Sequence, residues 1–238
     1  MLKQAQADGI VKLVCTSHFL SKADLERENE IWPYYHELVE RARDANIQVE
    51  IYMGSELYLT PDLSLDYQVC TLAGNGRYFL VEFPMGSIPE YAAQMFFDFL
   101  MGDKVPVLAH PERNAGFLEN PGRAYNFVER GVILQVTASS LLGNFGTRIR
   151  KYAFDLLDAN LVQVVATDAH NLSSRPLMLS TAYHIVAENW GIERADLLFY
   201  ENPGKLISGE KIVIGETWPV GKSSKKNFGT IIKSMFKI

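Results

Sequence analysis

The stretch Val164-Val165-Ala166-Thr167-Asp168-Ala169-His170 joins an apolar, β-branched run to an aspartate and a histidine that stand two positions apart. Such a run, without polar alternation, predicts a buried strand. The aspartate and the histidine then follow the carboxyl end of that strand, and both are side chains that bind metal ions. Four earlier apolar runs end in the same way and lead to His18, Glu56, Glu82 and His110. This recurrence indicates one shared site.

Strand-like and helix-like segments alternate along the whole chain. The strands are expected at residues 11–16, 47–53, 77–83, 104–109, 132–137 and 161–167, and the helices at 2–9, 24–45, 89–101, 118–129, 147–159, 176–189 and 194–207. Pro33 must kink or restart the helix in which it lies. Continuous apolar strands separated by helices predict a parallel sheet that helices cover.

Among parallel α/β folds, we expect a β/α barrel, because the active site of a barrel is built from the carboxyl ends of many strands. An open doubly wound sheet is the alternative, and it binds ligands between only a few strands. The 238 residues, 47% of them hydrophobic, are enough for one large core.

The composition restricts the class of function. The 23 lysines and arginines are outnumbered by 28 aspartates and glutamates, and a net charge of −5 argues against a nucleic-acid-binding protein. No apolar run approaches the roughly 20 residues that cross a bilayer, and the polar first residues do not resemble a secretory signal. The two cysteines, Cys15 and Cys70, indicate no disulfide framework. We therefore expect a cytoplasmic protein.

The candidate ligands are three carboxylates and three imidazoles: Glu56, Glu82, Asp168, His18, His110 and His170. Carboxylates that converge repel and raise the pKa of one another, and divalent cations remove that cost. Mixed nitrogen and oxygen ligands suit Mn, Zn or Fe. Two or more such ions would bind phosphate oxygens and lower the pKa of a bridging water. Arg113 and Arg175 follow His110 and His170 closely and offer planar donors for a phosphate.

Simpler interpretations exist for single residues. A lone histidine at a strand end, such as His18, is more often structural than a ligand. Glu82 alone could pair with an arginine, and either candidate arginine could hold a loop through Glu112 or Asp168. Ser139 and Ser140 lack the elbow motif of a nucleophilic serine.

Several motifs together resemble a known family: the manganese-dependent bacterial protein-tyrosine phosphatases of the polymerase and histidinol phosphatase (PHP) superfamily, which accompany capsule and exopolysaccharide gene clusters. The resemblance spans roughly residues 1–210 and rests on Thr16-Ser17-His18, Gly54-Ser55-Glu56, Glu82-Phe83-Pro84, His110-Pro111-Glu112-Arg113-Asn114, Gln135-Val136-Thr137-Ala138-Ser139-Ser140-Leu141, Gly143-Asn144-Phe145-Gly146, Ala166-Thr167-Asp168-Ala169-His170-Asn171 and Arg175-Pro176.

The resemblance implies a distorted seven-stranded (β/α)7 barrel with a trinuclear Mn2+ site and hydrolysis by metal-bound hydroxide. Its implied substrate is the phosphotyrosine tail of a membrane-associated tyrosine autokinase. Carried over by position, one metal is bound by Glu56, Glu82 and His110, a second by His18 and His170, and a third by Asp168, with Glu56 as a bridge. Arg113 and Arg175 match the arginines that grip phosphate.

The family begins with a strand that runs into a His-x-His pair, and a Gly-rich loop with an aspartate follows. The first residues here match the helix after that strand, so we expect the first β/α element and its ligands to be missing and activity to be impaired. Two alternatives are a small-molecule PHP phosphoesterase, of the histidinol phosphatase kind, and a non-catalytic remnant that binds the kinase.

Residues 1–210 are expected to form the phosphatase domain and residues 211–238 a basic tail. The tail contains Lys222, Lys225, Lys226, Lys233 and Lys237, with Ile231, Ile232, Met235 and Phe236 at helical spacing. A short amphipathic turn of this kind suits an anionic membrane surface. The alternative is an unstructured tail, or one that packs on the barrel or on a neighbouring subunit of a homo-oligomer.

Overall fold

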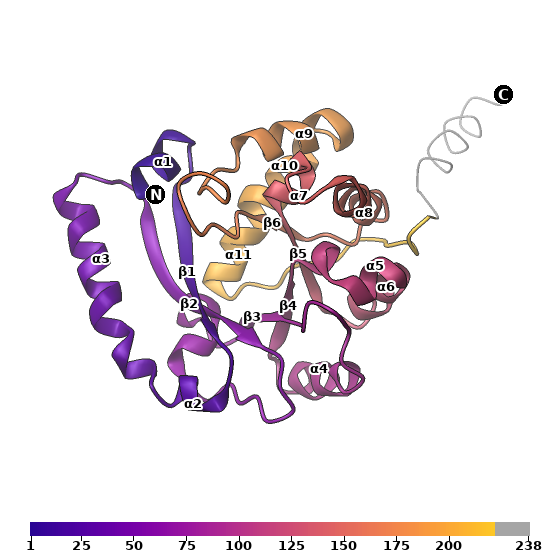
Figure 1. The fold of residues 1–238 in the computed structure, drawn as a ribbon, viewed down its shortest axis with the longest axis horizontal. Coiled ribbons are helices and arrows are strands. Elements are labelled where there is room, and N and C mark those ends of the chain that lie inside the picture. Colours follow the sequence, from indigo (N-terminus) through magenta and orange to yellow (C-terminus); the bar gives the residue numbers. More distant parts are fainter. Residues whose placement is uncertain (222–238) are drawn as a thin grey trace.

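The computed structural model describes residues 1–221, so the predicted amphipathic turn of the tail lies outside the described residues. Its centre is a parallel sheet of six strands in the order β1-β2-β3-β4-β5-β6, which curls into a half-barrel (Figure 1). The strands are β1 (Lys12–Phe19), β2 (Glu50–Tyr58), β3 (Tyr78–Glu82), β4 (Val105–Ala109), β5 (Ile133–Thr137) and β6 (Val164–Ala166). Strands that are neighbours in sequence are neighbours in space, so there is no switch point and the doubly wound alternative is wrong.

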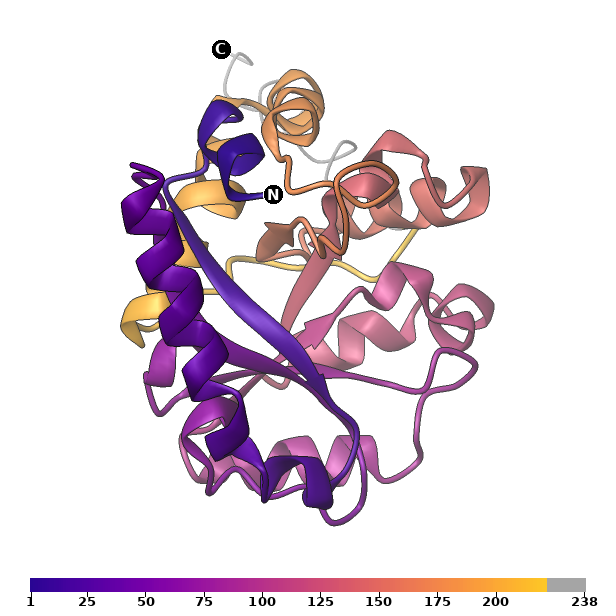
Figure 2. The ribbon, with the colours of Figure 1, turned by 60° about the vertical axis from the view of Figure 1, so that its left-hand side comes forward.

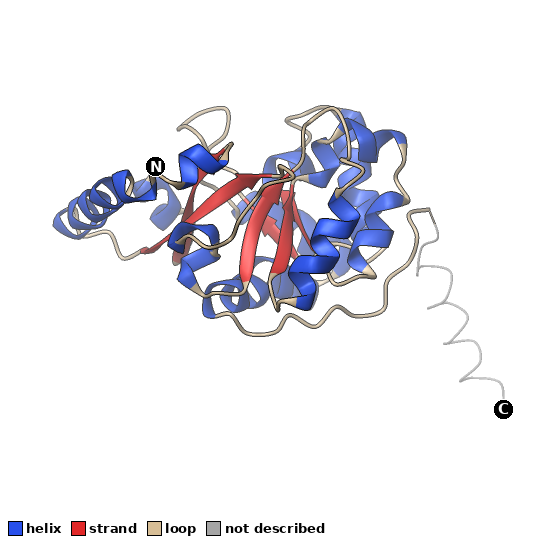
Figure 3. Cartoon of the chain, turned by 90° about the horizontal axis from the view of Figure 1, so that it is seen from below, coloured by secondary structure: helices blue, strands red, loops and turns tan. Residues whose placement is uncertain are grey.

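Helices lie around this sheet (Figure 3). They are α1 (Leu2–Ala7), α2 (Lys22–Leu25), α3 (Trp32–Asp44), α4 (Ala92–Met101), α5 (Ala115–Glu119), α6 (Arg123–Val128), α7 (Ala138–Leu142), α8 (Thr147–Asp158), α9 (Ser180–Trp190), α10 (Ile192–Asp196) and α11 (Asn202–Ser208). Single 3-10 turns are η1 (Glu28–Glu30), η2 (Gln68–Cys70), η3 (Leu72–Gly74) and η4 (Pro111–Arg113), and η5 (Leu197–Glu201) is a π-helical turn.

Several predicted boundaries are corrected by the structure. The expected helix 24–45 is divided, and Pro33 lies in the first turn of α3, where its missing N–H costs no helical hydrogen bond. The expected helix 118–129 is divided between α5 and α6 by Pro121 and Gly122. Strands β1 and β2 run further than predicted, so His18 and Glu56 lie within strands rather than after them.

The central strands are buried on both faces, as a helix-covered parallel sheet requires. Successive residues of a strand point to opposite sides, and β3 shows the result. Phe79 and Val81 join the larger core beneath the helices, whereas Tyr78 and Leu80 join a second cluster with residues of β4, β5 and β6. Both faces of the sheet therefore contribute to stability.

The two ends of the sheet, β1 and β6, are not paired with each other within residues 1–221. The Asp8 carboxylate, at the end of α1, accepts a hydrogen bond from the backbone N–H of Ser180, which follows β6 along the chain, at 3.0 Å. Figure 2 shows α3 alongside β1 and β2, and the Tyr35 hydroxyl of α3 donates to the Ile51 carbonyl at 2.8 Å. A cavity of about 570 Å³ lies between the start of β1 and α9, η5 and α11.

The described part of the predicted tail contacts the rest of the protein. The side chain of Ile212 is buried, and its backbone N–H donates to the Tyr78 hydroxyl at 2.9 Å. The backbone N–H of Trp218 donates to the Ala159 carbonyl at 3.0 Å. Within residues 1–221, no helix is both long enough and apolar enough to cross a membrane.

Candidate metal centre

The carboxyl ends of β1, β2 and β3 bring three predicted ligands together. The parallel register places His18 of β1 beside Glu56 of β2, and Tyr58 of β2 beside Glu82 of β3. One ligand atom from each of His18, Glu56 and Glu82 can be chosen so that all three lie within 4.8 Å of one another. This separation is compatible with a single ion between them.

His110, which follows β4, completes this cluster. Its Nε2 lies 2.8 Å from Glu56 Oε1 and 3.5 Å from Glu82 Oε2, and His18 Nδ1 lies 3.3 Å from Glu82 Oε1. The side chains of Glu56 and His110 are only 5% and 6% exposed. The chain therefore concentrates two carboxylates and two imidazoles in a small, mostly buried volume.

The charges of this cluster shift the pKa of its members. Burial and the Glu56 carboxylate raise the pKa of Glu82. Burial works to raise the pKa of Glu56, but the hydrogen bond and charge of His110 outweigh it and lower that pKa. Burial works to lower the pKa of His110, but Glu56 raises it. Carboxylates held this close to one another and to imidazoles are the mixed oxygen and nitrogen ligands of a divalent cation such as Mn, Zn or Fe. The residues therefore fit a metal site.

A second cluster lies beside the first, after β6. Asp168 Oδ2 accepts hydrogen bonds from the guanidinium groups of both Arg113 and Arg175. His170 Nδ1 lies 3.1 Å from the main-chain oxygen of Asp168, and the His170 ring lies 5.9 Å from that of His18. The two rings join the two clusters. The arginines thus contact Asp168, as the alternative interpretation of these residues had it.

Two of these positions have an unusual backbone. His110 has φ 35° and Asp168 has φ 50°, both in the left-handed region that non-glycine residues rarely adopt. Such conformations persist only where the surroundings hold them, and they concentrate at functional sites. They lie in the segments that follow β4 and β6.

The structure also identifies supporting residues outside the predicted ligands and phosphate-binding arginines. Glu112 is completely buried, and its Oε1 accepts a hydrogen bond from the Thr137 backbone N–H at 3.0 Å and one from the Ser140 hydroxyl at 2.6 Å. Glu112 thereby joins the turn that carries His110 to the end of β5. No periodicity marks it, because its partners come from 25 and 28 residues further along the chain.

Asn114 and Phe145 are further supports. The Asn114 side chain accepts hydrogen bonds from the backbone N–H of Gly116 and Phe117 at the start of α5, and it donates to the Pro84 carbonyl at 2.7 Å. The Phe145 ring lies 4.6 Å from the Arg113 guanidinium carbon, a cation–π distance. The only sequence signal for either residue is its place in a motif of the resembled family.

The fold and the whole chain have known relatives. Residues 1–208 match the family model of capsular polysaccharide synthesis proteins CpsB/CapC. The chain is 31% identical over 216 residues to the putative tyrosine-protein phosphatase CapC of Staphylococcus aureus. This match covers 90% of this chain and 82% of that protein. It is 31% identical over 232 residues to the tyrosine-protein phosphatase YwqE of Bacillus subtilis (strain 168). That match covers 96% of this chain and 90% of YwqE.

A solved structure is also similar. It comes from the crystal structures of YwqE from Bacillus subtilis and CpsB from Streptococcus pneumoniae, which are described as unique metal-dependent tyrosine phosphatases. The TM-score is 0.81 at 30% sequence identity, over 93% of this chain and 91% of that one. The match therefore extends over almost all of both chains. The chain belongs to the CpsB/CapC family of capsular polysaccharide synthesis proteins.

Proposed function

We propose that the chain is a metal-dependent protein-tyrosine phosphatase of the cytoplasm. Its substrate is the phosphotyrosine tail of a membrane-associated bacterial tyrosine kinase, and it thereby regulates capsular polysaccharide synthesis. The observation that carries this proposal is the convergence of His18, Glu56 and Glu82 within 4.8 Å, beside a pair of arginines. The relatives YwqE and CpsB are tyrosine-protein phosphatases, and both have solved structures that are described as metal-dependent. For the fold, we infer the distorted (β/α)7 barrel of the PHP superfamily.

The metal that we propose is Mn2+, held by Glu56, Glu82 and His110, with His18, Asp168 and His170 around further ions. When bound, such ions neutralise phosphate oxygens and lower the pKa of a coordinated water. The carboxylates of Glu56, which is buried, and of Glu82, which is half-buried, orient the ligand set and supply its negative charge. His110 bridges the two carboxylates and keeps them in place.

Arg113 and Arg175 bind the phosphate in this proposal. Each guanidinium is oriented by Asp168, and each has donors besides those that Asp168 takes. Nε of Arg175 is buried and has no hydrogen-bond partner among the described residues. The Phe145 ring also packs on Arg113 and limits its freedom. Planar donors held in this way stabilise charge that develops on the phosphoryl group.

The test is Mn2+-dependent release of phosphate from a phosphotyrosine peptide, with histidinol phosphate as a second substrate. We expect turnover of the peptide, its loss on chelation, and its recovery on addition of Mn2+. A Glu82→Gln variant should bind Mn2+ more weakly and lose turnover, because it removes one of the converging carboxylates. A matched control is Glu90→Gln, which removes the same charge from a residue outside both clusters. Turnover of histidinol phosphate alone would overturn the proposal.

A further inference from the structure

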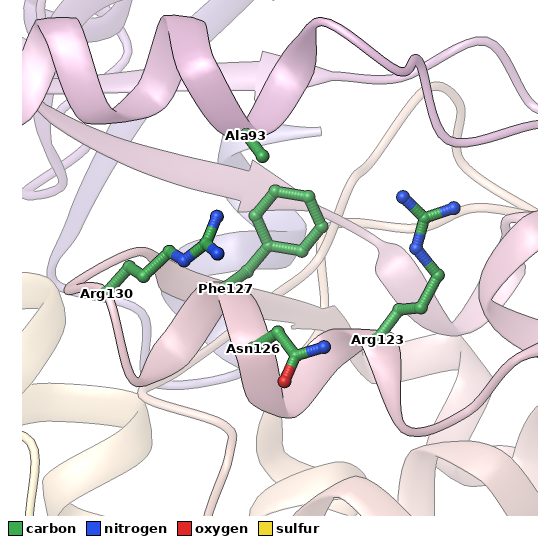
Figure 4. A pocket seen from close by; sticks show the side chains of 5 residues that line it. All are labelled: Ala93, Arg123, Asn126, Phe127 and Arg130. Atoms are coloured by element: carbon green, nitrogen blue, oxygen red, sulfur yellow. The ribbon is translucent and has the colours of Figure 1, made fainter.

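A small cavity lies on the outer side of the protein, between α4 and α6. Its volume is about 170 Å³, and it is lined by Ala93, Arg123, Asn126, Phe127 and Arg130 (Figure 4). Arg123, Asn126 and Arg130 are exposed, whereas Ala93 and Phe127 form an apolar floor. None of these residues belongs to the two clusters at the strand ends. The cavity is therefore a separate feature of the molecule.

Neither arginine has an acidic partner. Within residues 1–221, the side chains of Arg123 and Arg130 make no ion pair and no hydrogen bond to protein. Two carboxylates of the segments that form the cavity have other partners: the Glu129 carboxylate accepts a hydrogen bond from Thr217, and Asp98 accepts one from Gln94 at 2.9 Å. Both guanidinium groups thus keep their full positive charge and their donors on a protein whose net charge is −5.

The floor of the cavity is rigid. The Phe127 ring packs against the rings of Phe83, Phe96 and Phe117, with centroids 5.8, 5.8 and 5.9 Å away. Such a ring cluster holds Phe127 in one position, so a partner does not have to order it. An apolar side chain that enters the cavity gains a preformed surface.

The spacing of the two arginines describes the ligand. Figure 4 shows their guanidinium groups on either side of the Phe127 ring. Arg123 begins α6, and Arg130 follows the last residue of that helix, Val128. With the ring between them, the pair favours one anion on each side and an apolar group in the middle. In an extended chain the side chains of every second residue point to the same face, so positions i, i+2 and i+4 share one face over about 13 Å.

We propose that this cavity binds an extended acidic segment of a protein substrate. Two acidic side chains four positions apart pair with Arg123 and Arg130, and an aromatic or aliphatic side chain midway between them sits on Ala93 and Phe127. The Asn126 amide is positioned to bond to the backbone of that segment. This inference rests on the proposed function, because only a protein substrate has such a segment beside its phosphorylated residue. Binding at this second site lowers the KM for the protein substrate and leaves small substrates unaffected.

The first test is fluorescence anisotropy with a labelled peptide in which two glutamates flank a tyrosine at the stated spacing. The variant is Arg123→Glu with Arg130→Glu, and the control is Arg41→Glu with Arg43→Glu. The control changes the net charge equally at side chains of α3 that are 77% and 76% exposed. We expect the cavity variant to raise Kd at least about tenfold, the control less than about twofold, and high salt to weaken wild-type binding.

Three results would overturn the inference. The first is equal weakening by the cavity variant and the control, which would reduce the effect to net charge. The second is equal binding of a peptide whose tyrosine is replaced by glycine. The third is no binding to the wild-type chain at millimolar peptide. Melting temperatures within about 2 °C of the wild type exclude unfolding of the variants.

A second readout separates this inference from the proposed function. For a phosphotyrosine peptide that carries the acidic segment, the cavity variant should raise KM with little change in kcat, and p-nitrophenyl phosphate turnover should stay the same. If no substrate is turned over at all, the proposed function fails, whereas the anisotropy result still decides whether the acidic segment binds.

Discussion

Glu112 offers the sharpest test of how the site is held together. Its side chain is completely buried, and one oxygen accepts hydrogen bonds from the Thr137 N–H and the Ser140 hydroxyl, which are themselves 2% and 0% exposed. The other oxygen, Oε2, has no partner among the described residues. Burial raises the pKa of Glu112, so the protein favours its neutral form more than water does. A neutral side chain of the same shape should therefore replace Glu112 with little change in the free energy of unfolding.

The prediction is a contrast between two variants. Glu112→Ala leaves two buried donors without an acceptor, and each such donor costs about 1–3 kcal/mol. We expect the free energy of unfolding to fall by about 2–5 kcal/mol, a large part of the 5–15 kcal/mol that is typical of whole domains. Glu112→Gln keeps an oxygen acceptor at the position of Oε1 and should change the stability by less than about 1 kcal/mol.

Urea unfolding followed by circular dichroism measures both values, with equal m-values as the check that only stability has changed. Activity adds a second readout, because Glu112 lies between His110 and Arg113. At urea concentrations below its own unfolding midpoint, Glu112→Ala should already have lost turnover. Glu112→Gln should keep most of its turnover under the same conditions. Equal stability of the two variants would refute the reasoning, since it would show that the Thr137 and Ser140 donors find other acceptors.

Three further predictions follow from named contacts. Arg113→Ala or Arg175→Ala should lower kcat about 100-fold at unchanged Mn2+ content by mass spectrometry; a parallel loss of metal would assign these arginines to the orientation of Asp168 instead. His110→Ala should weaken Mn2+ binding in calorimetry by at least about tenfold, and unchanged affinity would exclude His110 from the metal site. Burial raises the pKa of Cys70 from 9.0 to about 11. The unfolded chain therefore ionises this thiol first, and the free energy of unfolding should fall as the pH rises from 9.0 towards 11. In thermal melts over that range, a Cys70→Ala variant should lose less stability than the wild type.

Much of the architecture follows from local patterns in the sequence. Continuous β-branched runs such as Val164-Val165 predict strands, and the polar residues that follow them predict where a site forms. The number of strands and their parallel arrangement follow from the alternation with helices, because a parallel connection needs a crossover. Segments where local preference and tertiary structure agree were predicted well, as in β4 (Val105–Ala109) and α8 (Thr147–Asp158).

Element ends were predicted less well, because they depend on partners elsewhere. β1 extends to Phe19 since each of its residues pairs with one of β2, up to Leu57. The helix expected from residue 118 onward is broken at Pro121 and Gly122, two residue types that interrupt helices. The short helix α7 (Ala138–Leu142) was missed, because its buried serines do not show an amphipathic pattern.

The sequence by itself determined which residue types stand at the strand ends, because periodicity and residue chemistry are local properties. Only the tertiary structure decided which of them meet. His18 and Glu56 are neighbours through strand register, both arginines contact Asp168, and Glu112 reaches the Thr137 N–H and the Ser140 hydroxyl. Register and sheet curvature follow from packing the whole core at once, and no window of sequence contains that information.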